Sequence, residues 1–220
     1  MSFASIGAGR AGPIPRLDAG TADADEAAFA DTRMLIQSRQ NTSAKRLVEP
    51  GPSAEQLDQL LSLAAAAPDH GLLTPWRFVM VPRDKRHQLA EVFALDLLDR
   101  DAGATLQQIE AAREKAHRAT LLLVAVARLG PREPDTRSLE RMVSMGAAVQ
   151  NILLGAHAMG FGAGLTSGHA MTSPRLRELL ALQEGDEAVC CINIGTVSQQ
   201  KRAVRCRPAP REFFSVLGSP

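Results

Sequence analysis

The chain has 220 residues, 45% hydrophobic and 22% charged, with a formal net charge of +1. This suits one domain with a sizeable core. The near-neutral balance lacks the basic excess of a nucleic-acid-binding protein. No apolar run reaches the ~20 residues that span a bilayer, so no membrane association is expected. Cys190 and Cys191 are adjacent and Cys206 makes the count odd, so we expect free thiols and a cytoplasmic protein.

Hydrophobic periodicity and capping residues predict the elements in chain order. Residues 1–25 are rich in Gly, Ala and Asp without an apolar period, and we expect a flexible N-terminal extension there. Residues 26–220 then form one domain with a long C-terminal tail. Helices are expected at 26–38, 53–67, 84–98, 105–118, 138–159 and from 173, and strands at 77–81, 119–127 and 187–196. Ser53 and Gln56 match a capping box at the start of the second helix, and Asp84 can cap the third. The continuous apolar run at 119–127 is typical of a central strand covered on both faces. Strands at such uneven distances indicate a mixed α and β fold.

The segment from Ser38 to Arg46 concentrates cations and hydrogen-bonding side chains. Guanidinium groups and hydroxyls match the oxygens of a phosphate, so a phosphate site is one interpretation. A solvated basic turn is the other.

A second segment joins a helix to a strand through a polar turn. Pro68 ends the helix, and Asp69, His70 and Gly71 follow before Pro75 leads into the strand. Such a turn can place side chains beside a ligand, although an ordinary connection would use the same residues to satisfy backbone groups.

The third segment, residues 160–168, holds four glycines and predicts a loop whose backbone approaches something flat or bulky. His169 follows it, and its role is open. No Gly-x-Ser-x-Gly elbow, phosphate-binding P-loop or pair of histidines at metal-ligand spacing occurs. The three segments therefore favour a phosphorylated planar cofactor over a nucleophile carried by the protein.

Two of these segments carry a resemblance to a known family. Ser38-Arg39 through Glu49-Pro50, and Ala67-Pro68-Asp69-His70 through Pro75-Trp76-Arg77-Phe78, resemble the nitroreductase family, above all its small bacterial members. The likeness runs from about residue 34 to 214. It implies an α+β, three-layer homodimer with a mixed, mainly antiparallel sheet flanked by helices. It also implies two FMN molecules at the subunit interface, each touching both chains, and a C-terminal tail that wraps the partner.

The resemblance also implies the cofactor-binding residues, position by position. Arg39 with Gln40, Asn41 and Ser43 would hold the phosphate and ribityl chain, His70 would approach the flavin, Leu165, Thr166 and Ser167 would line the ring, and Lys201 or Arg202 would lie near the phosphate. The spacing from Arg39 to Arg46 is about two residues longer than in relatives, which leaves open whether Asn41 or Ser43 contacts the flavin. No metal and no catalytic side chain is implied, because the flavin carries the chemistry.

The expected function is that of an FMN-dependent oxidoreductase. A hydride would pass from NADH or NADPH through the flavin to a nitroaromatic, quinone or similar acceptor in a ping-pong cycle. Two alternatives stay open. One is an oxygen-using or dehalogenase-like flavoenzyme of the same fold, and the other is a non-catalytic, flavin-binding regulatory dimer.

Overall fold

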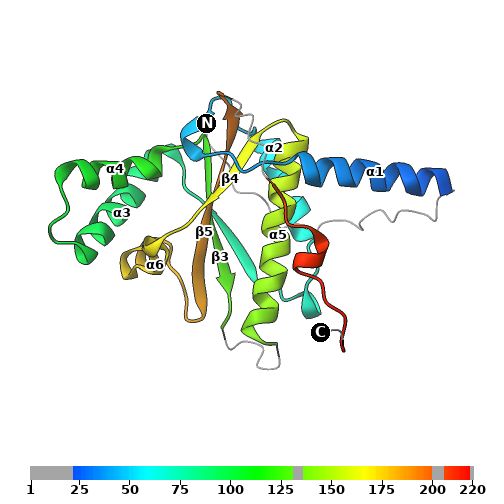
Figure 1. Ribbon diagram of the computed structural model, residues 1–220. Coiled ribbons are helices and arrows are strands. Elements are labelled where there is room, and N and C mark those ends of the chain that lie inside the picture. The colour runs from blue at the N-terminus through cyan, green and yellow to red at the C-terminus, as the bar shows by residue number, and fades with distance from the viewer. Residues whose placement is uncertain (1–21, 131–135, 200–205, 219–220) are drawn as a thin grey trace.

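The computed structural model describes residues 22–130, 136–199 and 206–218, which form the expected α+β architecture of a sheet between two helical layers (Figure 1). Within this part of the chain the sheet has five strands in the order β1-β5-β3-β2, with β4 also paired to β5. All these strand pairs are antiparallel. The strands are β1 (Leu47–Val48), β2 (Trp76–Met80), β3 (Leu121–Arg128), β4 (Gly162–Thr166) and β5 (Asp186–Val197).

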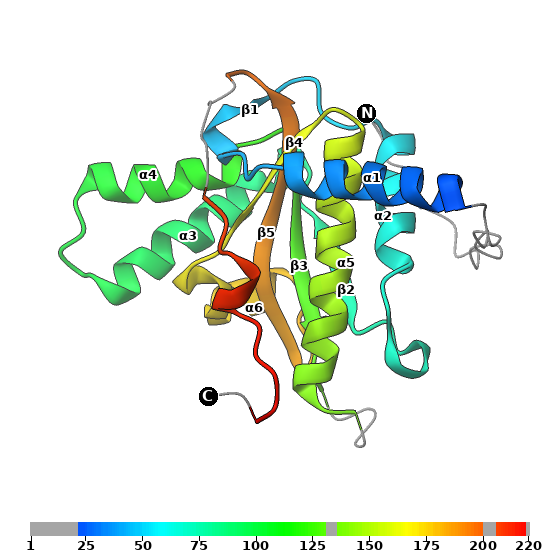
Figure 2. The same ribbon diagram turned by 45° about the vertical axis from the view of Figure 1, so that its right-hand side comes forward.

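Helices α2 (Ala54–Ala65) and α5 (Ser138–Ala158) cover one face of the sheet. Helices α3 (Arg86–Arg100), α4 (Leu106–His117) and α6 (Pro174–Leu179) lie on the other face (Figure 2). The central strand β3 supplies both cores, because alternate side chains of a strand point to opposite faces. Leu121 and Leu123 pack with α2 and α5, whereas Leu122 and Val124 pack with the opposite layer. This accounts for the unbroken apolar run that predicted a strand covered on both sides.

Most boundaries follow local sequence signals. At the start of α2 the predicted capping box forms, since Gln56 N–H donates to Ser53 Oγ at 3.1 Å and Ser53 N–H donates to Gln56 Oε1 at 2.9 Å. The expectation that Asp84 caps the next helix is wrong. Asp84 lies in a short 3-10 turn, η3 (Arg83–Lys85), and the helix begins at Arg86 without a side-chain cap.

Arg86 instead acts as a buried clasp between elements. Its side chain reaches the carbonyls that follow α4, with Nη1 at 2.7 Å from Ala119 O and Nη2 at 2.9 Å from Thr120 O. Nη1 also lies 3.0 Å from Arg118 O. Burial, with a smaller contribution from neighbouring Arg83, lowers the pKa of this guanidinium from its ordinary value. The carbonyls at the end of α4 are thus satisfied by a charged side chain from α3.

Two strands escaped prediction. β1 is only two residues long, and β4 occupies the segment that was expected to be a glycine-rich loop. Glycine has little intrinsic preference for strands, so the sequence carries no local signal for β4.

Helix α1 (Ala22–Ser38) projects from the body of the molecule (Figures 1 and 2). It begins inside the expected flexible extension, whose residues 1–21 lie outside the described part of the chain. Ala27, Ala30 and Met34 of this helix are exposed in the single chain. Phe29, on the same helix, is 66% exposed.

The C-terminal segment also carries exposed apolar side chains. It contains a short turn, η5 (Pro210–Glu212), followed by Phe213 and Phe214, which are 72% and 68% exposed. No helix in the described ranges is long and apolar enough to cross a membrane.

Candidate functional site

The predicted phosphate segment and the predicted ring-lining segment meet at the free edge of β4. Asn41 forms an isolated parallel bridge with Ala163, and Thr42 N–H donates to Ala163 O at 2.9 Å. The Asn41 side chain reinforces the junction, because its Oδ1 accepts the N–H of Leu165 at 3.3 Å. Two segments separated by more than 100 residues are therefore joined side by side.

The glycines of β4 make this junction possible. A Cβ on Gly164 would stand 2.2 Å from Thr42 O, and one on Gly162 would stand 2.5 Å from Val197 Cγ2. Close backbone approach was expected here, but these two glycines admit the protein's own chain rather than a ligand. Gly168 has open space around it, so that end of the segment is the part that can accept a ligand.

A polar pocket of about 420 Å³ lies beside the junction, on the side of α5. Its lining combines Arg39, Gln40 and Asn41 with His157 from the end of α5. His157 Nε2 lies 2.8 Å from Ser38 Oγ, which fixes the entry to this segment. Three of the predicted phosphate-binding residues thus line one cavity rich in hydrogen-bond donors.

The chain leaves β5 next to the same segment. Ser198 N–H donates to Arg46 O at 2.9 Å, and Arg46 Nη1 donates to Gln199 O at 3.2 Å. Lys201 and Arg202, predicted to lie near the phosphate, fall outside the described residues. The exit that precedes them does run along the segment that begins at Arg39.

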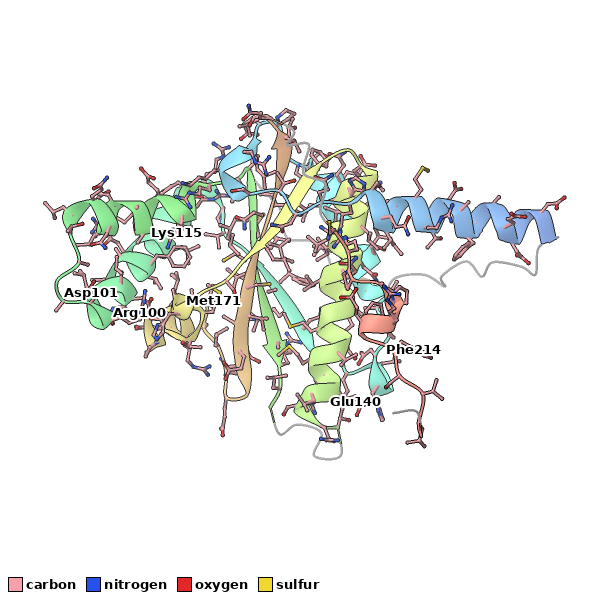
Figure 3. All side chains as sticks on the ribbon, viewed as in Figure 1. Arg100, Asp101, Lys115, Glu140, Met171 and Phe214 are labelled. Atoms are coloured by element: carbon pink, nitrogen blue, oxygen red, sulfur yellow. The ribbon has the colours of Figure 1, made fainter. Side chains whose placement is uncertain are left out.

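A second pocket, of about 470 Å³, lies on the opposite face between α3, α4 and η4 (His169–Thr172). Arg100 on α3, Lys115 on α4 and Met171 on η4 come from the three elements around it (Figure 3). Thr166 and Ser167 also line it, whereas Leu165 and Ser43 are exposed nearby. The charged or titratable lining residues are Asp96, Arg100, Lys115, Arg118, His169 and Cys191.

Sequence reasoning missed the helical part of this pocket. Asp96, Arg100 and Lys115 read as ordinary charged positions on solvent-facing helices, and only the fold turns them toward a common space. The one available signal was the position of His169 directly after the glycine-rich segment.

The side chains from β4 and β5 that line the second pocket are unreactive. Thr166 Oγ1 accepts a hydrogen bond from Asn193 Nδ2 at 2.9 Å. Burial, with a smaller effect of Cys190, raises the pKa of Cys191 to about 12, so its thiol stays protonated. The described residues contain no cluster of side chains suited to a metal ion.

His70 lies in a turn with unusual backbone geometry. Leu72 and Thr74 join Gly71 at positive φ, with values of 58°, 46° and 62°. Non-glycine residues in this region are strained, and such strain is concentrated at functional sites. The His70 side chain is exposed and its Nδ1 lies 2.6 Å from Glu140 Oε1.

One chain does not bring His70 to the other predicted residues. His70 contacts Glu140 in the first turn of α5, whereas Ser38 contacts His157 in its last turn. These two α5 residues are 17 positions apart, which is about 25 Å along a helix axis. The two groups of predicted residues therefore lie at opposite ends of α5 (Figure 2).

Fold and pockets together define a three-layer α+β protein with donor-rich cavities on both sides of one sheet edge. A model of the nitroreductase family matches residues 39–196. The chain belongs to this family, as the sequence motifs predicted, and is an oxidoreductase. It is 31% identical over 184 residues to a Haemophilus influenzae protein named "Putative NAD(P)H nitroreductase", covering 84% of this chain and 97% of that one.

Solved structures share the fold. A nitroreductase-like family protein from Bacillus cereus superposes with a TM-score of 0.72 at 19% identity, covering 85% of this chain and 96% of that one. A Desulfovibrio desulfuricans structure described as "a putative nitroreductase in complex with fmn" gives a TM-score of 0.62 at 23% identity, covering 86% of this chain and 96% of that one.

Proposed function

We propose that the protein is an FMN-dependent NAD(P)H oxidoreductase that reduces a small organic acceptor such as a nitroaromatic or a quinone. The observation that carries the proposal is the junction of Asn41 with Leu165, which combines a phosphate-type segment and a ring-lining segment at one edge. The relatives' names and the FMN in the Desulfovibrio structure support the same cofactor and donor.

The donor set around the junction fits FMN. Arg39 and Gln40 would bind the phosphate, since a guanidinium fork and an amide suit its oxygens. Ser43 is the better candidate than Asn41 for a direct flavin contact, because the Asn41 carbonyl oxygen already accepts from Leu165. Among the described residues the Ser43 hydroxyl has no hydrogen-bond partner. When bound, FMN would supply the hydride chemistry, and the protein would orient the ring along Leu165–Ser167.

Cations near the ring-lining residues suit charge stabilisation. Lys115 and Arg118 line the pocket that Thr166 and Ser167 also line. Fixed cations beside a cofactor that gains negative charge on reduction lower the energy of the reduced form.

A second copy of the chain would complete the site. His70 and Arg39 are too far apart in one chain to share a ligand, so His70 would serve the flavin held by the partner. Exposed apolar residues offer a surface for that copy: Phe29 and Met34 on α1, Val143 on α5, and Phe213 and Phe214 in the tail. Burial of such side chains is the usual driving force for a stable homodimer.

The test is the visible spectrum of the purified protein, followed anaerobically during addition of NADH and then NADPH. We expect a flavin spectrum that bleaches with one or both donors and recovers when a quinone is added. A colourless protein that also fails to bind added FMN would refute the proposal. A bound flavin that stays oxidised would favour the regulatory or oxygen-using alternatives.

A further inference from the structure

The pocket between α3, α4 and η4 contains a histidine–carboxylate pair. His169 Nδ1 lies 3.0 Å from Asp96 Oδ1, and the Asp96 side chain is only 6% exposed. Arg100 Nε donates to the other carboxylate oxygen at 3.3 Å. The partner of Nδ1 is a carboxylate oxygen, which is an acceptor, so we assign the Nδ1 atom of His169 as the donor of this hydrogen bond.

The second ring nitrogen of His169 remains available. Within the described part of the chain, Nε2 has no hydrogen-bond partner, and the His169 side chain is 58% exposed. His169 lines the same pocket as Thr166 and Ser167, the residues assigned to the ring under the proposed function. A molecule that is reduced in this pocket can therefore meet Nε2.

We propose that His169, oriented by Asp96, is the proton donor to the electron acceptor. The inference rests on the proposed function, which supplies the hydride, and adds to it a named acid. Asp96 is a positioning residue in this scheme, since it acts through the imidazole.

The other groups in the pocket are poor candidates for this role. An aliphatic hydroxyl such as that of Thr166 is a far weaker acid than an imidazolium, and burial raises the pKa of the Cys191 thiol to about 12. Lysine and arginine side chains are weak acids at neutral pH, whereas imidazole is the side chain best suited to exchange protons between pH 5 and 8. The charged and titratable groups around His169 are Asp96 and Arg100 from α3, Lys115 from α4, Arg118 after it and Cys191 from β5.

The proton transfer balances for a quinone. A quinone that accepts a hydride becomes a hydroquinone monoanion. The imidazolium of His169 gives its Nε2 proton to the anionic oxygen, and the N–H electron pair stays on nitrogen. The product is a neutral hydroquinone and a neutral imidazole that keeps its Nδ1 proton toward Asp96. Water then returns a proton to Nε2.

Anaerobic stopped-flow measurements on the FMN-loaded protein separate the two half-reactions. In His169→Gln we expect reduction by NAD(P)H to stay within about twofold. Oxidation of the reduced protein by 1,4-benzoquinone should slow on the order of 100-fold, as is typical for loss of a general acid. Asp96→Asn should slow the same half-reaction by about tenfold. His117→Gln, an exposed histidine on α4 outside the pocket, is the matched control and should change neither step.

A second readout does not depend on turnover. Long-range proton–nitrogen NMR of the purified full-length protein should find the neutral His169 ring protonated on Nδ1, and Asp96→Asn should shift the proton toward Nε2. Unchanged quinone reduction in His169→Gln, or a wild-type ring protonated on Nε2, would overturn the inference alone. A protein whose flavin is not reduced by either nucleotide would overturn the proposed function as well.

Discussion

Asn41 and Leu165 are joined by a hydrogen bond from the Leu165 N–H to Asn41 Oδ1, across 124 positions of the chain. The bond ties the segment that begins at Arg39 to β4. It separates two roles that are adjacent in sequence, because Asn41 braces the site while Ser43 stays available to a ligand. Substitutions of Asn41 and of Ser43 should therefore have different effects on stability and on flavin binding.

Asn41→Ala should lower both stability and FMN affinity. Loss of one hydrogen bond that leaves the Leu165 N–H without its partner costs about 1–2 kcal/mol. Ser43→Ala should weaken FMN binding without changing the free energy of unfolding, since its hydroxyl has no partner among the described residues. Fluorescence titration with FMN and urea unfolding distinguish the two. Equal destabilisation by both variants would contradict the separation of roles.

Gly164→Ala should disrupt the same junction by sterics. The new Cβ would stand 2.2 Å from Thr42 O, so backbone must move and stability should fall by at least about 2 kcal/mol. Gly103→Ala is the control, because its Cβ would meet the nearest atom, Asp101 Oδ1, at 3.4 Å, which is ordinary contact. Urea midpoints report both. A neutral Gly164→Ala would mean that residues 41–42 do not pack on β4.

Arg86→Met should be strongly destabilising, by about 3–5 kcal/mol. The methionine fills the space but leaves the carbonyls after α4 without donors in a buried place. Arg86→Lys keeps one donor group, so its loss of stability should lie between that of Arg86→Met and zero. Arg83→Met, an exposed neighbour, should shift the melting temperature little. Thermal unfolding followed by circular dichroism ranks the three variants by melting temperature. Similar effects of Arg86→Met and Arg83→Met would refute the stabilising role of the buried Arg86 side chain.

Heterodimers test which chain supplies His70. If His70 serves the partner's flavin, mixing Arg39→Ala chains with His70→Ala chains creates one intact site in each mixed dimer. Activity should then rise above that of either variant alone. If both residues served the same chain's flavin, every site would carry one defect and mixing would restore nothing. Co-expression with two affinity tags isolates the mixed species.

The three thiols should differ in reactivity. Burial raises the pKa of Cys190 to about 11 and that of Cys191 to about 12, while Cys206 is exposed. Iodoacetamide at pH 8 should therefore modify Cys206 and spare the other two until the protein unfolds. Because the folded thiols bind protons more tightly than unfolded ones, their contribution to stability is complete below pH 9 and is lost as pH rises further. Peptide mapping by mass spectrometry checks the labelling, and rapid native labelling of Cys191 would contradict it.

Local signals predicted much of the fold. The capping pair Ser53 and Gln56 marked the start of α2, and the apolar run of β3 marked a central strand before any partner was known. β4 escaped because its glycines reflect contact with residues 41–42, and such non-local contact leaves no period in the sequence.

The site divides in the same way. Arg39, Gln40 and Asn41 stood out through composition and line one pocket. The sequence did not single out Asp96, because its role depends on contact with His169, 73 positions away, and on a turn that brings the two residues together. Chemistry carried by a contiguous segment could be predicted, whereas chemistry assembled from separate helices could not.

The length of α5 has a consequence for how the protein behaves on dilution. Arg39 lies near one end of this helix and His70 near the other. If His70 serves the partner's flavin, as proposed, a lone chain carries half of two different sites and no complete site. Specific activity should therefore depend on protein concentration, and flavin retention should fall together with it. In a cell, the amount of chain synthesised would then set not only how many catalysts exist but also what fraction of them are competent.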